Sequence, residues 1–174
     1  MQMYEDVRKK RNPLFNPRYM AKQLLNWSSV EEVKTSVTIN EYLHPTMDPG
    51  AQRLEHSVVR MKMGTEILFV RHGRDIFDRH NEVNRLAEAA AWNFIMYASL
   101  ARASRSYCIG LQWSDYECLI ANTICYEGFD VVKQMMIALE IGPQMVGDDL
   151  YQEVATKMFD TKGYFPTHPT TRNY

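Results

Sequence analysis

Cysteine is the residue of this 174-residue sequence with the clearest capacity for nucleophilic chemistry, which needs an activated thiolate. Cys118 and Cys125 lie seven positions apart, so they share one face of a predicted helix, and that face is largely apolar. We therefore expect both to be buried structural thiols. Cys108, near a predicted helix end beside Arg105, is the cysteine to test for reactivity. Three cysteines without a Cys-x-x-Cys pair indicate a reducing compartment and no disulfide framework.

Histidines and carboxylates are the side chains of this sequence that could bind a metal ion. His72, Asp75 and His80 could gather near the end of one predicted helix, although we expect that helix end to be solvated. The Glu-x-x-His motif of di-iron helical bundles does not occur, and neither do the GxGxxG and GxxxxGK[ST] motifs that bind nucleotides. We expect no metal site and no cofactor.

Two arginines and two glutamates are the remaining candidates for a polar site. Arg102 and Arg105 are three residues apart on one helical face, where they could bind an anion, but pairing with Glu117 or Glu127 on the next helix is the favoured interpretation. Glu127 lies within an apolar helical segment, where it could act as a buried base or as half of a structural ion pair. The ion pair is favoured, and no catalytic residue is predicted.

Apolar periodicity predicts the elements that position these residues. Four helices are expected, joined by short connections: Ala51–Arg79, Glu82–Tyr107, Ser114–Leu139, and a fourth from Asp148 or Asp149 to just before Gly163. The sequence thus predicts an all-α fold, an antiparallel four-helix bundle with an extended N-terminal arm and an irregular C-terminal tail. A dense turn signal at His44–Gly50 suggests residues 1–42 as arm or linker and 43–174 as the bundle domain.

The Glu82–Tyr107 segment has no Gly or Pro and is apolar around most of its circumference. One face carries Ala89, Trp92, Met96 and Leu100, and a second, nearly opposite, carries Val83, Leu86, Ala90, Phe94, Ala98 and Ala101. We expect a central helix covered by neighbours on several sides.

The first 30 residues hold a local excess of positive charge, while the whole chain has a net charge of −1, which argues against nucleic acid as a partner. Such a basic amphipathic segment could lie on an anionic membrane or act only as a linker. The sequence has no apolar run long enough to span a membrane, no signal-peptide core, and an imperfect mitochondrial presequence. The expected membrane or partner contacts are Arg8, Lys9, Lys10, Arg11, Arg18, Met20, Lys22, Leu24 and Trp27.

Four short motifs occur in the order found in one family: LHP at Leu43–Pro45, LARASRSYCIGL at Leu100–Leu111, ANTICYEG at Ala121–Gly128, and HPTTR at His168–Arg172. Over about residues 43–172 the chain resembles the C-terminal helical domain of very-long-chain acyl-CoA dehydrogenase and of acyl-CoA dehydrogenase family member 9, and is closest to the latter. The YEG sequence at Tyr126–Gly128 echoes the family's catalytic YEGT, but Phe129 replaces the Thr. The resemblance therefore implies a structural Glu127.

The resemblance implies that flavin and acyl-CoA sites belong to a preceding dehydrogenase body. It suggests a non-catalytic mitochondrial module at the matrix side of the inner membrane, working by protein–protein contact as an accessory subunit or assembly factor of a respiratory complex such as complex I. Its expected partners are protein subunits of that complex and the membrane surface, with a homodimer as a further option. The alternatives are a fragment, or separately encoded part, of a flavin-dependent acyl-CoA dehydrogenase and an autonomous membrane-surface protein.

Overall fold

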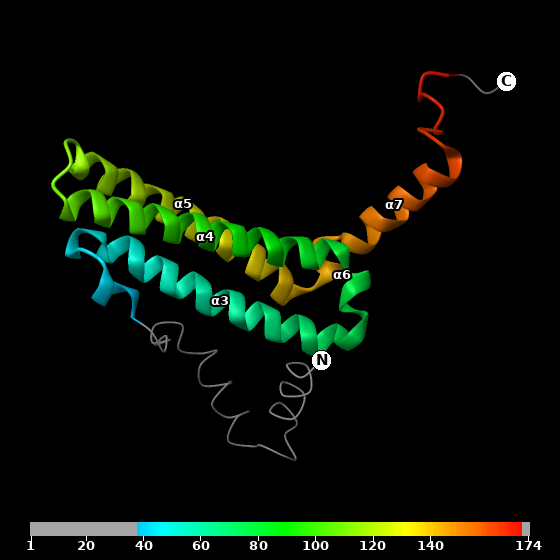
Figure 1. Cartoon of the computed structure of the whole chain (residues 1–174). Coiled ribbons are helices and arrows are strands. Elements are labelled where there is room, and N and C mark those ends of the chain that lie inside the picture. Colours follow the sequence, from blue (N-terminus) through cyan, green and yellow to red (C-terminus); the bar gives the residue numbers. More distant parts are fainter. Residues whose placement is uncertain (1–37, 172–174) are drawn as a thin grey trace, which may run out of the picture. The chain divides into compact units, whose positions relative to one another are not determined.

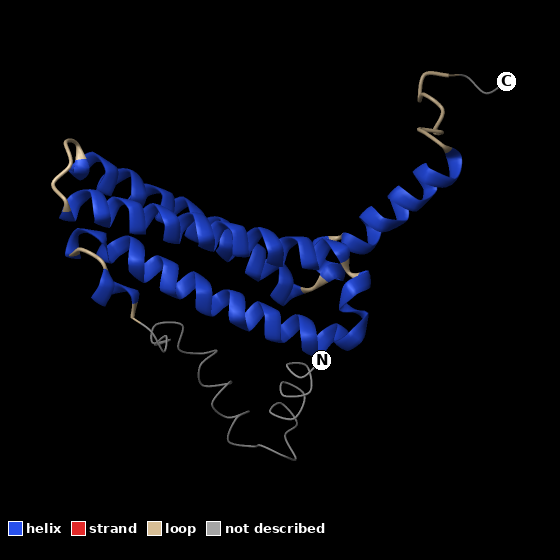
Figure 2. Ribbon diagram, in the orientation of Figure 1, coloured by secondary structure: helices blue, strands red, loops and turns tan. Residues whose placement is uncertain are grey.

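The computed structural model describes residues 38–171, and within that range all regular structure is helical (Figures 1 and 2). The all-α fold class is therefore confirmed. The expected membrane contacts between Arg8 and Trp27 lie outside the described residues. The elements are three short 3-10 helices, η1 (Ile39–Tyr42), η2 (Pro45–Met47) and η3 (Gly73–Asp78), and five α-helices, α3 (Asp48–His72), α4 (His80–Cys108), α5 (Ser114–Ile141), α6 (Pro143–Val146) and α7 (Asp148–Thr161).

The chain divides into two compact units, one ending at Glu140 and one beginning at Ile141. In the first unit α3, α4 and α5 run alternately up and down beside one another (Figure 1). The fourth expected helix is α7, which belongs to the second unit and is described separately below.

The first long helix is shorter than the sequence predicted. We expected it to run from Ala51 to Arg79, but α3 ends at His72 because Gly73 takes a positive φ of 60°, which a glycine adopts readily. The chain then continues as η3 and turns into α4. This early turn places the end of α3 beside the start of α4.

Asn122 of α5 makes two hydrogen bonds to the backbone at the beginning of α3. Its Oδ1 accepts a hydrogen bond from the Gly50 amide at 3.1 Å, and its Nδ2 donates to the Thr46 carbonyl, also at 3.1 Å. On the same stretch, the His44 amide donates to Ser104 Oγ of α4 at 3.1 Å. The short η1–η2 segment is thereby held against both α4 and α5.

A single hydrophobic core lies between α3, α4 and α5. The inner face of α4 contributes Ala89, Met96 and Leu100, as the periodicity predicted, with Trp92 packed against their edge. The other long helices add Leu54 and Leu68 from α3 and Cys125, Val132, Met136 and Leu139 from α5.

The second apolar face of α4 is not covered, contrary to our expectation. Phe94 is 70% exposed, and Val83, Ala90, Ala98 and Ala101 are exposed as well. Only Leu86 of the predicted set is partly buried. Within the described residues α4 is therefore covered mainly on one side, because α3 and α5 both pack against its inner half.

Small residues allow the three helices to approach closely. A Cβ atom added at Gly128 of α5 would lie 2.9 Å from Met96 Cγ and 3.2 Å from Trp92 Cε3, and one added at Gly64 of α3 would lie 2.6 Å from Met136 Sδ. These distances are shorter than a normal van der Waals contact, so glycine is what permits the observed spacing.

The second unit contains α6 and α7. Gly142, with a φ of 98°, and Pro143 end α5 as predicted, and Gly147, with a φ of 86°, separates α6 from α7. The α7 side chains Leu150, Val154 and Met158, which recur at helical spacing, are exposed. None of the helices between residues 38 and 171 combines the length and the hydropathy that a membrane-spanning helix needs.

Candidate functional site

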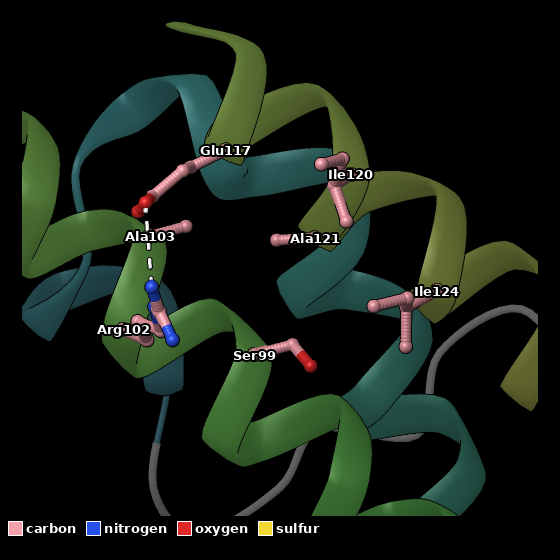
Figure 3. Close-up of a pocket in the computed structure, with 7 residues that line it drawn as sticks. All are labelled: Ser99, Arg102, Ala103, Glu117, Ile120, Ala121 and Ile124. Carbon is pink, nitrogen blue, oxygen red and sulfur yellow. Dashed lines mark ion pairs between the residues drawn. The ribbon is translucent and has the colours of Figure 1, made fainter. Parts of the chain in front are cut away.

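A groove lies between α4 and α5 near the turn that joins them (Figure 3). Its volume is about 260 Å³, and its walls are mostly apolar. From α4 it is lined by Ser99, Arg102 and Ala103, and from α5 by Glu117, Ile120 and Ile124. The Ser99 hydroxyl is already engaged, because it donates to the Ile95 carbonyl at 2.8 Å.

Among residues 38–171, the charged side chains that line this groove are those of Arg102 and Glu117, which face each other across it. Arg102 Nη2 lies 3.5 Å from Glu117 Oε1, and the arginine side chain is 80% exposed. The second carboxylate oxygen, Glu117 Oε2, is buried and has no hydrogen-bond partner among the described residues. The pair is therefore long and half-satisfied, which makes it a weak contributor to stability.

The other two members of the predicted polar set lie at the surface. Glu127 is exposed and not buried, and no ion pair connects it or Arg105 to another described residue. Glu127 is therefore neither the buried base nor the ion-pair partner that the sequence suggested, because the apolar side of α5 is defined by Cys125, Gly128 and Val132, and Glu127 points away from it.

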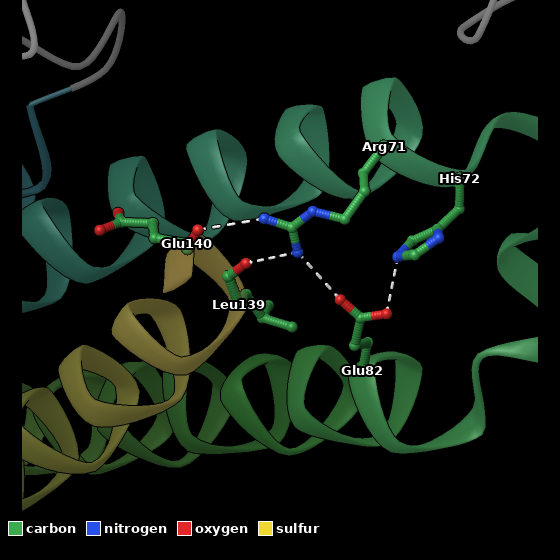
Figure 4. A network of polar contacts seen from close by, with 5 residues as sticks. All are labelled: Arg71, His72, Glu82, Leu139 and Glu140. Carbon is green, nitrogen blue, oxygen red and sulfur yellow. Dashed lines mark hydrogen bonds and ion pairs between the residues drawn. The ribbon is translucent and has the colours of Figure 1, made fainter. Parts of the chain in front are cut away.

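A second polar cluster, absent from the sequence predictions, joins the ends of three helices (Figure 4). Glu82 of α4, only 2% exposed, places Oε1 3.0 Å from Arg71 Nη1 and Oε2 2.7 Å from His72 Nε2. Arg71 also donates to the carbonyls of Leu139, at 2.8 Å, and Glu140, at 3.0 Å. We call these five residues the Arg71 network. Its arginine satisfies two carbonyls in the last turn of α5 that the helix itself cannot bond.

The Arg71 network includes one of the three residues that the sequence suggested as metal ligands. His72 faces Glu82 and is largely buried, whereas we expected this helix end to be solvated; Asp75 and His80 are exposed. Among residues 38–171 no three His, Cys, Asp or Glu side chains come close enough to hold a metal ion.

The cysteines lie where the sequence predicted. Cys118 and Cys125 are buried, and Cys108 is exposed. Burial raises the pKa of the Cys125 thiol to about 11, against a smaller opposing effect of the Arg53 charge. A thiol with a pKa so far above neutrality is a poor nucleophile. Cys125 is thus a component of the core.

The outer face of α4, which the sequence indicates as apolar but which we expected to be covered, is a candidate surface. It consists of Val83, Ala87, Ala90, Phe94, Ala98 and Ala101, which recur every three or four residues and are all exposed. Ile95 and Tyr97 flank it and are also exposed. The available signal was the apolar circumference of the helix, which we took to indicate burial on every side.

These features indicate the class of protein. The chain contains an all-α domain of three antiparallel helices that pack closely at glycines, and its described part exposes apolar surfaces beside α4 that could contact another molecule. The sequence model for "ACAD9/ACADV, C-terminal domain" matches residues 45–164, more than half of the chain. The chain belongs to this family of acyl-CoA dehydrogenase C-terminal domains.

Among curated proteins the chain is similar to the very long-chain specific acyl-CoA dehydrogenases of mitochondria. It is 22% identical to the Mus musculus protein over 112 residues, 21% to the Rattus norvegicus protein over 140 and 23% to the Homo sapiens protein over 109. These alignments cover 64%, 79% and 63% of this chain but only 17%, 21% and 17% of the relatives. The chain therefore spans about a fifth of their length.

Proposed function

We propose that this chain is a helical module that acts by protein–protein contact and does not itself catalyse a reaction. The observation that supports this proposal is the outer face of α4, where Phe94, Ile95 and Tyr97 project from an alanine-rich surface. Exposed apolar patches of this kind typically mark interaction sites, because leaving them in water is unfavourable.

We place this activity in mitochondria, at the matrix side of the inner membrane, as an accessory subunit or assembly factor of a respiratory complex. The relatives named above are mitochondrial proteins, which supports the compartment. The basic and apolar residues between Arg8 and Trp27 support a membrane contact, since such a sequence suits an anionic surface. The assembly role follows from the family resemblance alone.

A second candidate is that the chain works as the C-terminal part of a flavin-dependent acyl-CoA dehydrogenase, either within a longer protein or bound to a separate body. The matched relatives favour it, because they carry this domain as about a fifth of a dehydrogenase. In that case flavin and acyl-CoA would bind outside the residues described here.

The two candidates can be separated by capturing the chain from detergent-solubilised mitochondrial membranes and measuring native mass, composition and flavin absorbance. The decisive variant is Phe94→Glu, which places a charge at the centre of the outer face of α4 without disturbing the core. Phe77→Glu is the matched control, because Phe77 is 81% exposed but lies on η3.

For the module hypothesis we expect a large assembly of defined subunits whose yield is reduced at least tenfold in the Phe94→Glu variant and unchanged in the Phe77→Glu variant, while the separated chain itself carries no flavin. A flavin-containing complex with the mass of a dehydrogenase would support the second candidate. If both variants keep the wild-type composition, the outer face of α4 is not the contact surface.

A further inference from the structure

One carboxylate oxygen in the groove between α4 and α5 has no hydrogen-bond donor within residues 38–171. Glu117 Oε2 lies buried without a partner among the described residues, and Arg102 reaches only the other oxygen, at 3.5 Å. Figure 3 shows both groups at one end of the groove, with Ile120 and Ile124 along its wall. A buried carboxylate oxygen without a donor is unfavourable, so this end of the groove is suited to a cationic or hydrogen-bond-donating side chain.

The α5 side of the groove carries two apolar side chains flanked by two acidic ones, of which Glu127 lies one helical turn beyond the lining residues. Glu117, Ile120, Ile124 and Glu127 follow one another at intervals of three, four and three residues, so they form one stripe along the helix. Over its full length α5 carries five acidic side chains, Asp115, Glu117, Glu127, Asp130 and Glu140, and one basic side chain, Lys133. The stripe is complementary to a segment that carries both basic and apolar residues.

Such a segment is present in the same chain. Residues 7–30 contain six basic side chains and no acidic one, and Met20, Leu24 and Trp27 recur at intervals of four and three. These intervals match those of the α5 stripe in a helix-in-groove contact. The charges are also complementary over larger stretches, since residues 38–171 have 17 acidic and 12 basic side chains, whereas residues 1–37 have 7 basic and 4 acidic ones.

The described chain begins beside α3 and α4. The Ile39 amide donates to Glu55 Oε1 of α3 at 2.6 Å, and the His44 amide donates to Ser104 Oγ of α4, which follows the groove residue Ala103 but points to another side of the helix. Residues 31–37 can extend to roughly 25 Å, more than twice the ~10 Å spacing of packed helices, so this stretch is long enough to pass around a helix. A short tether also gives a high effective concentration at the groove.

We propose that residues 7–30 of this chain dock in the groove between α4 and α5, with apolar side chains on Ile120 and Ile124 and basic side chains on Glu117 and Glu127. Docking covers the apolar wall and supplies a donor to Glu117 Oε2. Docking also occupies the basic residues of segment 7–30, so a membrane surface has to compete with the groove for this segment. The inference is independent of the function proposed above and holds for either candidate.

Photo-crosslinking in the full chain tests this placement. The residue Trp27 is replaced by p-benzoylphenylalanine, a 1:1 mixture of ¹⁴N- and ¹⁵N-labelled chains is irradiated, and the crosslinked peptides are identified by mass spectrometry. We expect crosslinks to peptides containing residues 99–103 or 120–124, joining chains of the same isotope. Raising NaCl from about 50 to 500 mM should lower their yield several-fold, because salt screens the exposed charges.

Charge reversal provides the matched controls. The Glu117→Lys/Glu127→Lys variant should reduce the groove crosslinks at least fivefold, and adding Arg18→Glu/Lys22→Glu should restore them. Asp160→Lys, an exposed change on α7, should have no effect. Far-ultraviolet circular dichroism checks that each variant remains helical.

Three results would overturn the proposal. Groove crosslinks of which about half join chains of different isotopes, as random pairing of a 1:1 mixture gives, would indicate a second copy as the occupant. Crosslinks confined to other surfaces of the same chain would exclude the groove. An unchanged yield in the Glu117→Lys/Glu127→Lys variant would exclude the ionic recognition. The same experiment in the presence of cardiolipin-containing vesicles tests whether a membrane competes with the groove. If it does, crosslinks from position 27 to lipid should increase while crosslinks to the groove decrease.

Discussion

At the scale of single residues, Glu82 is the most constrained charged group in the described part of the chain. It is 2% exposed and faces both Arg71 and His72 (Figure 4). Removing one member of a buried ionic cluster is costly, because the remaining charges lose their partner without regaining water.

We therefore expect Glu82→Gln to lower the free energy of unfolding by about 2 kcal/mol, less than a full pair disruption because the amide still accepts a hydrogen bond. Urea denaturation followed by circular dichroism measures the change. Glu153→Gln is the control, since it removes an exposed pair with Lys157 within α7 and should leave the midpoint nearly unchanged. Equal effects of the two substitutions would contradict a structural role for the Arg71 network.

The buried thiol of Cys125 predicts how the stability of the protein depends on pH. Its thiol has a pKa of about 11 in the folded protein, because of burial, against 9.0 for an exposed cysteine. A raised pKa in the folded state means that the unfolded chain loses this proton first. The stabilisation is complete below about pH 9 and is lost as the pH rises toward 11.

Unfolding experiments between pH 8 and 11 should consequently show a steeper loss of stability for the native sequence than for Cys125→Ala, whatever the offset caused by the smaller side chain. Alkylation with iodoacetamide at pH 8 should modify the exposed Cys108 quickly and Cys125 only when the protein unfolds. Rapid alkylation of Cys125 in the folded protein would refute its burial.

At the scale of the elements, the position of Gly128 determines how closely α5 approaches α4. We expect Gly128→Val to destabilise the protein by about 2 kcal/mol, because its Cβ would meet Met96 and Trp92 and the core would have to shift. Thr123→Val controls for placing valine in the same helix, since Thr123 is exposed. Thermal unfolding of the two variants, compared with the native chain, checks the prediction; a similar change in both would point to helix propensity and not to packing.

Sequence reasoning predicted the helices well, because their apolar periodicity and their terminal glycines are local signals. It did not predict which side of α4 would be covered. Met96 and Phe94 are equally apolar, and only the positions of α3 and α5 make one buried and the other exposed. The Arg71 network could not be predicted from the sequence either, because Arg71 and Glu82 meet only after Gly73 ends α3 and the chain reverses direction.

For the groove, the sequence supplied the residue pair but not its geometry. Arg102 was expected to face an acidic residue of the next helix, and Glu117 and Glu127 were equal candidates. A turn of only a few residues between Cys108 and Ser114 aligns the end of α4 with the beginning of α5, so Glu117 is the acid within reach. The buried, unpartnered Oε2 depends on side-chain positions that no sequence pattern encodes.

At the scale of the whole molecule, every core residue in the described range 38–171 precedes Glu140. We expect a chain that ends at Gly142, which keeps the two carbonyls bonded to Arg71, to unfold cooperatively with a Tm within a few degrees of the full chain. Differential scanning calorimetry provides the comparison. A broad transition, or a fall of more than about 10 °C, would show that the first unit depends on the rest of the chain.

The convergence of three helix ends on Arg71 has a consequence for how substitutions there behave in a cell. Glu82 and the last turn of α5 each depend on the same guanidinium, so its replacement loosens several elements at once. Proteases act on the transiently open fraction of a protein, and a small loss of stability can change abundance several-fold. A substitution at Arg71 should therefore lower the abundance of the protein in the cell, while the folded molecules that remain keep their contact surfaces.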